Sequence, residues 1–485
     1  MRRFAMLFTL LTISHYAIAQ DLSFPPIIEA DFFGSNSKEY LLQFDERIKL
    51  PCPKCSDEEI KELAKQWLYA YHQYISTFLA NLNYVKGDEQ GFSRGATLQP
   101  IELRREEEGF VSFGVKGRID GSTDLINRLK PGSKECASEQ PPPKGEAGSG
   151  HFYFCIPENP FDPHIQDHEW YEFSPNRFKK NHPKLRLAPP VGVALRAISN
   201  QDPTYPDYRS MFEDGVLHVV LLFGYDDVDN WGYENAKEVY EILTEPPSTY
   251  FSDINNNYYG YSGNGLGFSD PLEGDFEKIN AGGNATTFHK ENVHVRYRSN
   301  SGKIVERNVT IEVKMVVANP SRFSPGEVLN LFFSLVADAE LIHYDGHANY
   351  GGGLHLGDSW SDVISAEDLG SYLKFFPDNY QILSIGACHG SGYFVDLFYN
   401  QLKERKTTQN LDIITGINEL DFYDSVKSIF KLLKGISQLK VVDNTKTPNH
   451  GDPMNYLDLL RSLNHRNSSK GLIGVFGSQD NPTSW

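Results

Sequence analysis

The sequence lacks long hydrophobic runs outside its first twenty residues. A basic start, Met1-Arg2-Arg3, precedes an apolar segment at residues 4–13, and Ala17-Ile18-Ala19 then matches the small-residue site at which signal peptides are cut. No later segment approaches the ~20 apolar residues that a membrane-spanning helix needs. We therefore expect a signal peptide over residues 1–19, cleaved after Ala19, and a soluble mature protein that is secreted or periplasmic.

Positive charge is scarce as well. Lys and Arg together number 46 against 64 for Asp and Glu, so the formal net charge is −18. This balance argues against nucleic acid as a partner. Hydrophobic residues make up 40% and charged residues 23% of the chain, as in a globular protein, and 485 residues predict two or three domains.

Cysteine is the third rarity. Four lie in the N-terminal third and one stands apart: Cys52, Cys55, Cys136, Cys155 and Cys388. In an oxidising compartment four can pair, and the odd one is a reactive thiol or an intermolecular bridge. Cys388 is therefore the candidate reactive thiol, while the pairing of the other four stays open. The Cys52-Cys55 spacing also fits a redox pair, but the βαβ pattern expected before it is absent, which favours structural disulfides.

Residues 20–205 are expected to form a separate N-terminal domain of unknown function. Ser56 and Glu59 fit a capping box at the start of a long amphipathic helix. Apolar residues recur along that helix at helical spacing: Ile60, Leu63, Ala64, Trp67, Leu68, Tyr71, Ile75, Phe78, Leu79 and Leu82. Residues 140–150 are rich in Pro and Gly and predict an exposed loop or linker.

Residues 206–485 predict an α/β domain in which helices flank a mostly parallel sheet. Apolar runs typical of buried strands occur at residues 216–224, 340–344, 380–385, 411–417 and 471–477. Helical patterns fall between them, and Ser324 to Glu327 forms a second capping box with Pro325 at the first helical position. Residues 293–298 and 304–317 alternate apolar and polar positions, which predicts a hairpin at the sheet edge.

Two of these strands are followed by residues whose side chains can act in catalysis. The strands at 340–344 and 380–385 are joined by a helical segment at 365–376, so they predict a βαβ unit whose carboxyl ends lie side by side. His347 follows the first strand and Cys388 follows the second. A thiol beside an imidazole is the minimal equipment for nucleophilic catalysis. We therefore predict Cys388 as nucleophile and His347 as acid and base.

The same stretch resembles the caspase-like cysteine peptidases, and most closely their gingipain and clostripain branches. Tyr344-Asp345-Gly346-His347 is similar to the histidine end of that signature and Ile385-Gly386-Ala387-Cys388 to the cysteine end, with Trp360 and Phe394 adding to the likeness. The resemblance covers roughly residue 216 to the C-terminus. It implies a caspase-like sheet and a cysteine endopeptidase without a cofactor, acting on proteins or peptides through an acyl-enzyme.

The resemblance also implies that the backbone N–H groups of Cys388 and Ala348 hold the oxyanion. The family usually has glycine directly after the histidine, whereas this chain has Ala348. Alanine offers the same N–H but resists positive φ. A caspase-like scaffold that binds without cleaving is therefore one alternative.

A metal-dependent hydrolase is the other alternative. His343, His347, His355 and His389 crowd one region, and His343 and His347 with Asp345 have the side chains of a zinc site. In an extended strand, however, residues four apart are separated by about 13 Å, so the sequence favours the dyad and no metal. Residues 253–257 resemble the start of a calcium loop, but Tyr258 stands where that loop needs glycine.

Acidic residues cluster at the predicted mouth of the site. Asp345, Glu419 and Asp421 are the candidate substrate contacts. A carboxylate at the base of a pocket selects a basic side chain through a charge-assisted contact worth ~1.5–3 kcal/mol. The gingipain and clostripain resemblance implies the same Arg or Lys preference at P1, while the caspase branch implies Asp. The natural substrate, the oligomeric state and any activating cleavage, for which residues 140–150 and 255–267 are the expected sites, stay open.

Overall fold

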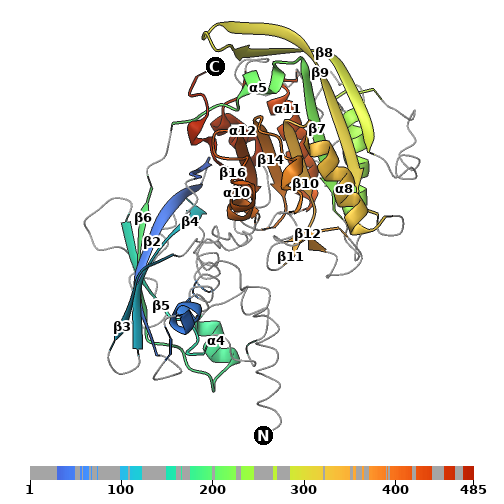
Figure 1. The fold of residues 1–485 in the computed structure, drawn as a ribbon. Coiled ribbons are helices and arrows are strands. Elements are labelled where there is room, and N and C mark those ends of the chain that lie inside the picture. Colours follow the sequence, from blue (N-terminus) through green and yellow to red (C-terminus); the bar gives the residue numbers. More distant parts are fainter. Residues whose placement is uncertain are drawn as a thin grey trace.

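Figure 1 shows the fold of the protein in a computed structural model. The structure describes residues 30–35, 37–49, 55–56, 58–64, 67, 71, 74, 99–106, 110–122, 149–159, 165, 175–198, 202–224, 231–244, 266–269, 285–319, 323–349, 353–356, 363–364, 371–388, 390, 394–417, 422–439, 453–464 and 473–484. The protein is an α/β protein built on a mixed eight-stranded sheet flanked by helices, with a five-stranded and a three-stranded sheet besides.

The large sheet has the strand order β1-β16-β15-β14-β10-β7-β9-β8. Its five inner strands run parallel: β15 (Leu411–Gly416), β14 (Gln381–Gly386), β10 (Leu341–Asp345), β7 (Val216–Phe223) and β9 (Ile304–Val317). The other three strands are antiparallel to their neighbours: β1 (Phe32–Gly34) and β8 (Thr286–Arg298) at the two edges, and β16 (Ile473–Phe476) between β1 and β15. The five apolar runs singled out in the sequence are thus confirmed as strands of one sheet.

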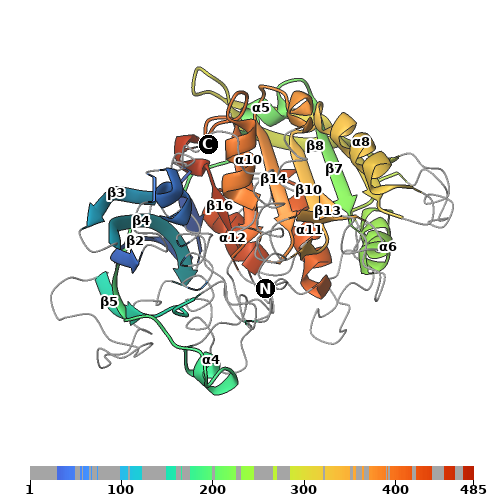
Figure 2. The ribbon, with the colours of Figure 1, turned by 60° about the horizontal axis from the view of Figure 1, so that its bottom comes forward.

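Helices cover both faces of this sheet (Figure 2). One face packs against α5 (Tyr208–Phe212), α6 (Trp231–Thr244), α11 (Phe422–Ile436) and α12 (Tyr456–Asn464). The other packs against α8 (Pro325–Val336) and α10 (Asp396–Leu402). Along β7, Val219 and Leu221 enter the first core and Val220 and Leu222 the second. Burial on both faces explains why the inner strands read as continuous apolar runs.

Local sequence signals account for several element boundaries. Ser324 accepts the backbone N–H of Glu327, whose carboxylate accepts the N–H of Ser324, so α8 begins at the predicted capping box. Of the predicted helix at 365–376, the described part ends in the 3-10 turn η2 (Leu373–Phe375), just before Pro377. Beyond Cys388, α10 begins at Asp396, and residues 391–393 lie outside the described residues.

The edge hairpin is confirmed, but β8 begins at Thr286 instead of residue 293. The reason is a register shift between Lys290 and Val293, where Asn292 has a φ of 59°. A bulge inserts one residue and reverses the alternation of faces. Phe288 and Val293 are therefore both buried although five positions separate them, and simple alternation cannot join the two halves.

The outer edge of β8 is covered by groups from elsewhere in the chain. Gln438, just after α11, has a φ of 51°. Its side-chain amide accepts the N–H of Arg296 at 2.9 Å and donates to the carbonyl of Arg296 at 3.0 Å, as a neighbouring strand would. Farther along, the N–H of Ser269 donates to the carbonyl of His289 at 2.8 Å. Uncovered edge strands invite pairing with other chains, so these contacts protect the sheet.

The five-stranded sheet is antiparallel, and we did not predict it. Its order is β3-β4-β2-β6-β5, with bounds Gln99–Glu106, Phe110–Ser122, Ser37–Lys49, Val191–Ala197 and Ser149–Phe154. It shares a core with the expected long helix, whose residues Ile60, Ala64 and Tyr71 are buried there, and with α4 (Pro175–Asn181). Ser56 and Glu59 form the predicted capping box.

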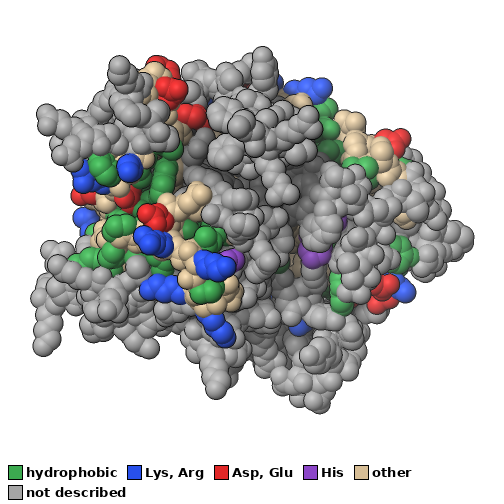
Figure 3. All heavy atoms as spheres, turned by 90° about the horizontal axis from the view of Figure 1, so that it is seen from below, with side chains coloured by type: hydrophobic (Ala, Val, Ile, Leu, Met, Phe, Trp, Pro, Cys, Tyr) green, Lys and Arg blue, Asp and Glu red, His purple; other side chains and the backbone are tan. Residues whose placement is uncertain are grey.

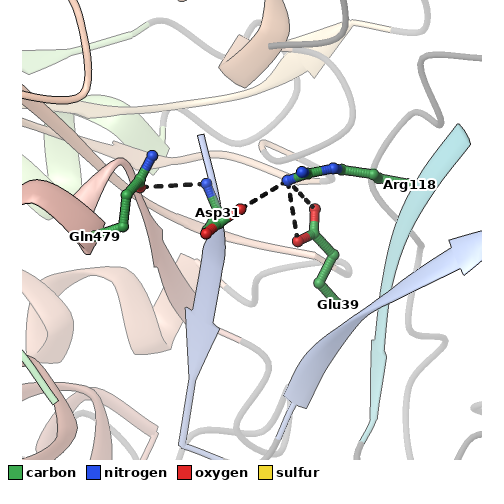
Figure 4. A network of polar contacts seen from close by, with 4 residues as sticks. All are labelled: Asp31, Glu39, Arg118 and Gln479. Carbon is green, nitrogen blue, oxygen red and sulfur yellow. Dashed lines mark hydrogen bonds and ion pairs between the residues drawn. The ribbon is translucent and has the colours of Figure 1, made fainter. Parts of the chain in front are cut away.

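A network of polar contacts joins the two large sheets (Figure 4). Arg118 on β4 donates to Asp31 at 2.8 Å and to Glu39 on β2 at 3.3 Å, and the N–H of Asp31 donates to the side-chain carbonyl of Gln479 at 3.3 Å. The adjacent strand β1 pairs with β16. Although β1 lies within residues 20–205, it therefore belongs to the larger sheet. The division into separate domains stays a prediction.

Several predictions fall outside the described residues: the signal peptide at 1–19, residues 140–148 of the predicted loop, the calcium-like segment, Cys52 and Cys136. The last two residues of that predicted loop, 149 and 150, belong to β5. Cys55 and Cys155 are buried and disulfide-bonded. Across the parts of the chain that the structure describes, no helix combines the length and apolar character needed to cross a bilayer.

Candidate active site

The sheet register brings the two predicted catalytic residues to neighbouring positions. In the parallel pair β10 and β14 the last partners are Asp345 and Gly386. The N–H of Gly346 then donates to the carbonyl of Gly386 at 3.2 Å, which extends the pairing by one step. His347 and Cys388 each follow the Asp345–Gly386 pair by two residues. Because neighbouring strands lie about 4.8 Å apart, the two residues leave the same edge of the sheet side by side.

Both residues are partly accessible. Cys388 carries a thiol and is half-buried, as is His347. Figure 3 views the molecule from the side on which β11 and β12 lie in Figure 1, and histidine side chains reach the surface there. The carboxyl edge of a parallel sheet is where open α/β proteins bind their ligands. The partly accessible side chains of His347 and Cys388 therefore lie at the edge of the sheet where such proteins bind ligands.

Tyr344 contacts the backbone of His347, and sequence reasoning gave it no role of its own. Its buried hydroxyl donates to the carbonyl of His347 at 2.8 Å and accepts the N–H of His355 at 3.0 Å. Burial raises the pKa of Tyr344, a hydrogen bond with His355 lowers it, and the charges of Asp345 and Cys388 raise it further. The hydroxyl therefore keeps its proton.

Asp345 is fully buried, which corrects its predicted role as a substrate contact. Its carboxylate accepts hydrogen bonds from the amide of Asn235 on α6 at 2.9 Å and from the hydroxyl of Ser425 on α11. Burial raises the pKa of Asp345 to about 6, although the bonds from Ser425 and Asn235 oppose the rise. The side chain faces the protein interior and ties two helices to the end of β10, which argues against contact with substrate.

The other histidines of this region have separate surroundings. The Nδ1 of His343 lies 2.9 Å from the hydroxyl of Ser384, and burial lowers the pKa of His343 to about 3, so its ring is neutral. The His355 ring is buried, with its centroid 6.3 Å from that of His347. His389 lies outside the described residues. Among those that are described, no group of three or more His, Cys, Asp and Glu side chains is arranged to hold a metal ion.

Ala348 occupies ordinary strand geometry. It begins β11 (Ala348–Asn349), which pairs with β12 (Gly353–His355), and this strand pairs with β13 (Val363–Ile364). In the described chain, positive φ at residues other than glycine occurs at Asn292 and Gln438. The expected conflict between alanine and a positive φ therefore does not arise.

The backbone N–H of Ala348 points away from the partner strand β12. The N–H of His355 donates to the carbonyl of His347 at 3.4 Å, so these two residues form the hydrogen-bonded type of antiparallel pair. The next pair, Ala348 and Leu354, is then of the other type, in which both amides turn away from the partner strand. The N–H of Ala348 is not used by β12 and remains directed away from it.

Of the remaining residues singled out in the sequence, one is described and three are not. Glu419, Asp421 and Trp360 lie outside the described residues, while Phe394 is buried in the core under α8 and α10. Neither the search of protein-family models nor the search of curated proteins found a match to this sequence.

Proposed function

We propose that the protein is a secreted cysteine endopeptidase with a caspase-like peptidase domain, in which Cys388 is the nucleophile and His347 the acid and base. The observation that supports this most strongly is the pairing of Asp345 with Gly386, after which both residues follow by two positions. Five parallel strands covered by helices on both faces are compatible with a caspase-like sheet. The separate core of the five-stranded sheet supports a distinct N-terminal domain.

In the proposed reaction, His347 takes the proton of the Cys388 thiol, and the resulting thiolate attacks the carbonyl carbon of the scissile peptide. The electron pair of the carbonyl moves to oxygen, and the N–H groups of Cys388 and Ala348 stabilise that oxyanion. When the C–N bond breaks, His347 gives its proton to the leaving amine. Water then attacks the thioester, His347 accepts its proton, and the thiolate of Cys388 leaves.

An imidazolium next to a thiol favours the thiolate, which is the reactive form. Two features of the site fit this role. Cys388 is half-buried, so the thiol is accessible without being fully hydrated. The amide of Ala348 is turned away from β12, as an oxyanion donor requires. We further propose that Glu419 or Asp421 selects Arg or Lys at P1.

Inhibition by two reagents tests the proposal. Iodoacetamide should abolish peptide hydrolysis in proportion to the carboxamidomethyl group that mass spectrometry finds on Cys388, whereas EDTA or phenanthroline should leave hydrolysis unchanged. Loss of activity with the chelators would instead identify a metal-dependent hydrolase. A folded protein that alkylates at Cys388 yet cleaves no member of a peptide library would be a binding protein on this scaffold.

A further inference from the structure

We infer that Tyr344 is a positioning residue of this site, whose hydroxyl fixes the backbone of His347 and thereby holds the imidazole next to Cys388. This inference rests on the proposed function. Tyr344 touches neither the substrate nor the reacting atoms in this account. It acts through His347.

One hydroxyl makes three backbone contacts. It donates to the carbonyl of His347 at 2.8 Å, lies 3.3 Å from the carbonyl of His355, and accepts the N–H of His355 at 3.0 Å. His347 leaves β10, whereas His355 ends β12. The hydroxyl therefore binds the backbone at both ends of the paired strands β11 and β12, at His347 just before β11 and at His355 at the end of β12. A phenylalanine ring in the same place would remove this shared partner.

Two glycines make room for this hydroxyl. A Cβ on Gly346 would lie 2.6 Å from the Tyr344 oxygen, and a Cβ on Gly224 would lie 2.9 Å from it. A Cβ atom closer than 3.0 Å would force the hydroxyl or the backbone to move. Glycine at these two positions therefore leaves space for the Tyr344 hydroxyl. The N–H of Gly224 also donates to the carbonyl of Asp345 at 2.7 Å. The last residues of β10 are thus surrounded by close backbone contacts that leave little freedom.

The end of β10 is also held from both faces of the sheet. Tyr344 belongs to the core under α8 and α10, while the carboxylate of Asp345 is bound by Asn235 and Ser425 on the α6 and α11 side. His347 follows these two anchors directly. A shift of about 1 Å in a catalytic group can cost about a hundredfold in rate. Tyr344→Phe should therefore lower kcat by ~10- to 100-fold, with KM changed by less than ~3-fold, because substrate contacts are kept.

Tyr399 provides a matched control. Its buried hydroxyl also donates to two backbone carbonyls, that of Leu411 at 2.6 Å and that of Phe476 at 3.3 Å, within the same core. A glycine, Gly477, likewise packs against this hydroxyl. Leu411 is the first residue of β15, at the end of the sheet opposite to the site. Tyr399→Phe should lower the thermal midpoint about as much as Tyr344→Phe and leave kcat unchanged.

The deciding experiment measures the rate at which iodoacetamide alkylates Cys388 from pH 5 to pH 10, in the wild type, Tyr344→Phe, Tyr399→Phe and His347→Ala. At pH 6 we expect alkylation to slow by ~10-fold in Tyr344→Phe, because a displaced imidazolium favours the thiolate less. The alkylation rate of Tyr399→Phe should equal that of the wild type at every pH. Near pH 10 all four proteins should be alkylated at similar rates, because the thiol is then ionised in each of them. His347→Ala should be at least as slow as Tyr344→Phe.

The outcomes separate this inference from the proposed function. If His347→Ala slows alkylation and Tyr344→Phe matches the wild type in both alkylation and kcat, only the positioning role is wrong. If His347→Ala itself alkylates like the wild type, the dyad fails. Should Tyr344→Phe not fold, Gly346→Ala takes its place, since the new methyl group displaces the hydroxyl; wild-type alkylation in that variant would overturn the positioning role.

Discussion

Asp412, a buried carboxyl group far from the proposed site, should make the free energy of unfolding depend on pH. It lies on β15, fully buried, and its Oδ2 accepts hydrogen bonds from the hydroxyls of Tyr380 and Tyr456 and from the amide of Asn481. Its Oδ1 is buried without a hydrogen-bond partner. Burial raises the pKa of Asp412 to about 6, the three hydrogen bonds oppose the rise, and nearby Asp207 adds to it.

The sign of the pH dependence follows from this raised pKa. The folded state holds the Asp412 proton more tightly than the unfolded chain, whose value is near 3.8. The resulting stabilisation is therefore fully present below about pH 4 and is lost as the pH rises through about 6. With 1.36 kcal/mol per pKa unit, it amounts to about 2–3 kcal/mol.

Asp412→Asn should remove this contribution. Asparagine keeps one oxygen for the three donors and carries no charge, so the variant should be at least as stable as the wild type at pH 7.5. Its free energy of unfolding should also fall by about 2–3 kcal/mol less than that of the wild type between pH 4 and pH 7.5.

Urea unfolding at several pH values measures both quantities. Asp458→Asn, on the exposed surface of α12, serves as the control and should follow the wild-type slope. A variant that keeps the wild-type pH slope and loses more than ~2 kcal/mol at pH 7.5 would refute the reasoning. In that case the ionised carboxylate would be a net stabilising partner of the two tyrosines.

Two further predictions concern the edge strand and the specificity of the site. Gln438→Ala should uncover the N–H and C=O of Arg296 on β8 and produce concentration-dependent self-association in light scattering; a monodisperse profile identical to that of the wild type would contradict this role. Glu419→Gln or Asp421→Asn should lower the preference for Arg over uncharged P1 residues by ~10- to 100-fold, whereas Asp345→Asn should leave that preference intact. If only Asp345→Asn lost the preference for Arg, then Asp345 would be the residue that contacts the substrate.

Local patterns predicted the parts of the fold that depend on neighbouring residues. The run that forms β7 is apolar throughout because both faces of the sheet are covered. The Ser324 capping box marks the start of α8 because it satisfies the helix N-terminus within four residues. The strand-end positions of His347 and Cys388 followed from the same reasoning, since the carboxyl ends of adjacent parallel strands must meet.

Contacts between residues that are far apart in the sequence could not be predicted from such local patterns. The alternation of Val111, Phe113 and Val115 marks a strand, but nothing local says that it pairs with β2, some seventy residues earlier. Likewise, strand alternation does not reveal that α6 and α11 cover Asp345, nor that the Tyr344 hydroxyl reaches back to His347 and forward to His355. These roles depend on how separate segments meet in space.

The most direct test of the peptidase assignment is the turnover of Cys388→Ala. The substitution replaces one small side chain with another at a half-buried position, so the thermal midpoint should stay within a few degrees of that of the wild type. Purified mature wild-type protein should cleave members of a peptide library, and the variant should cleave none of them. Hydrolysis by Cys388→Ala at a rate comparable to the wild type would contradict the assignment of Cys388 as the nucleophile.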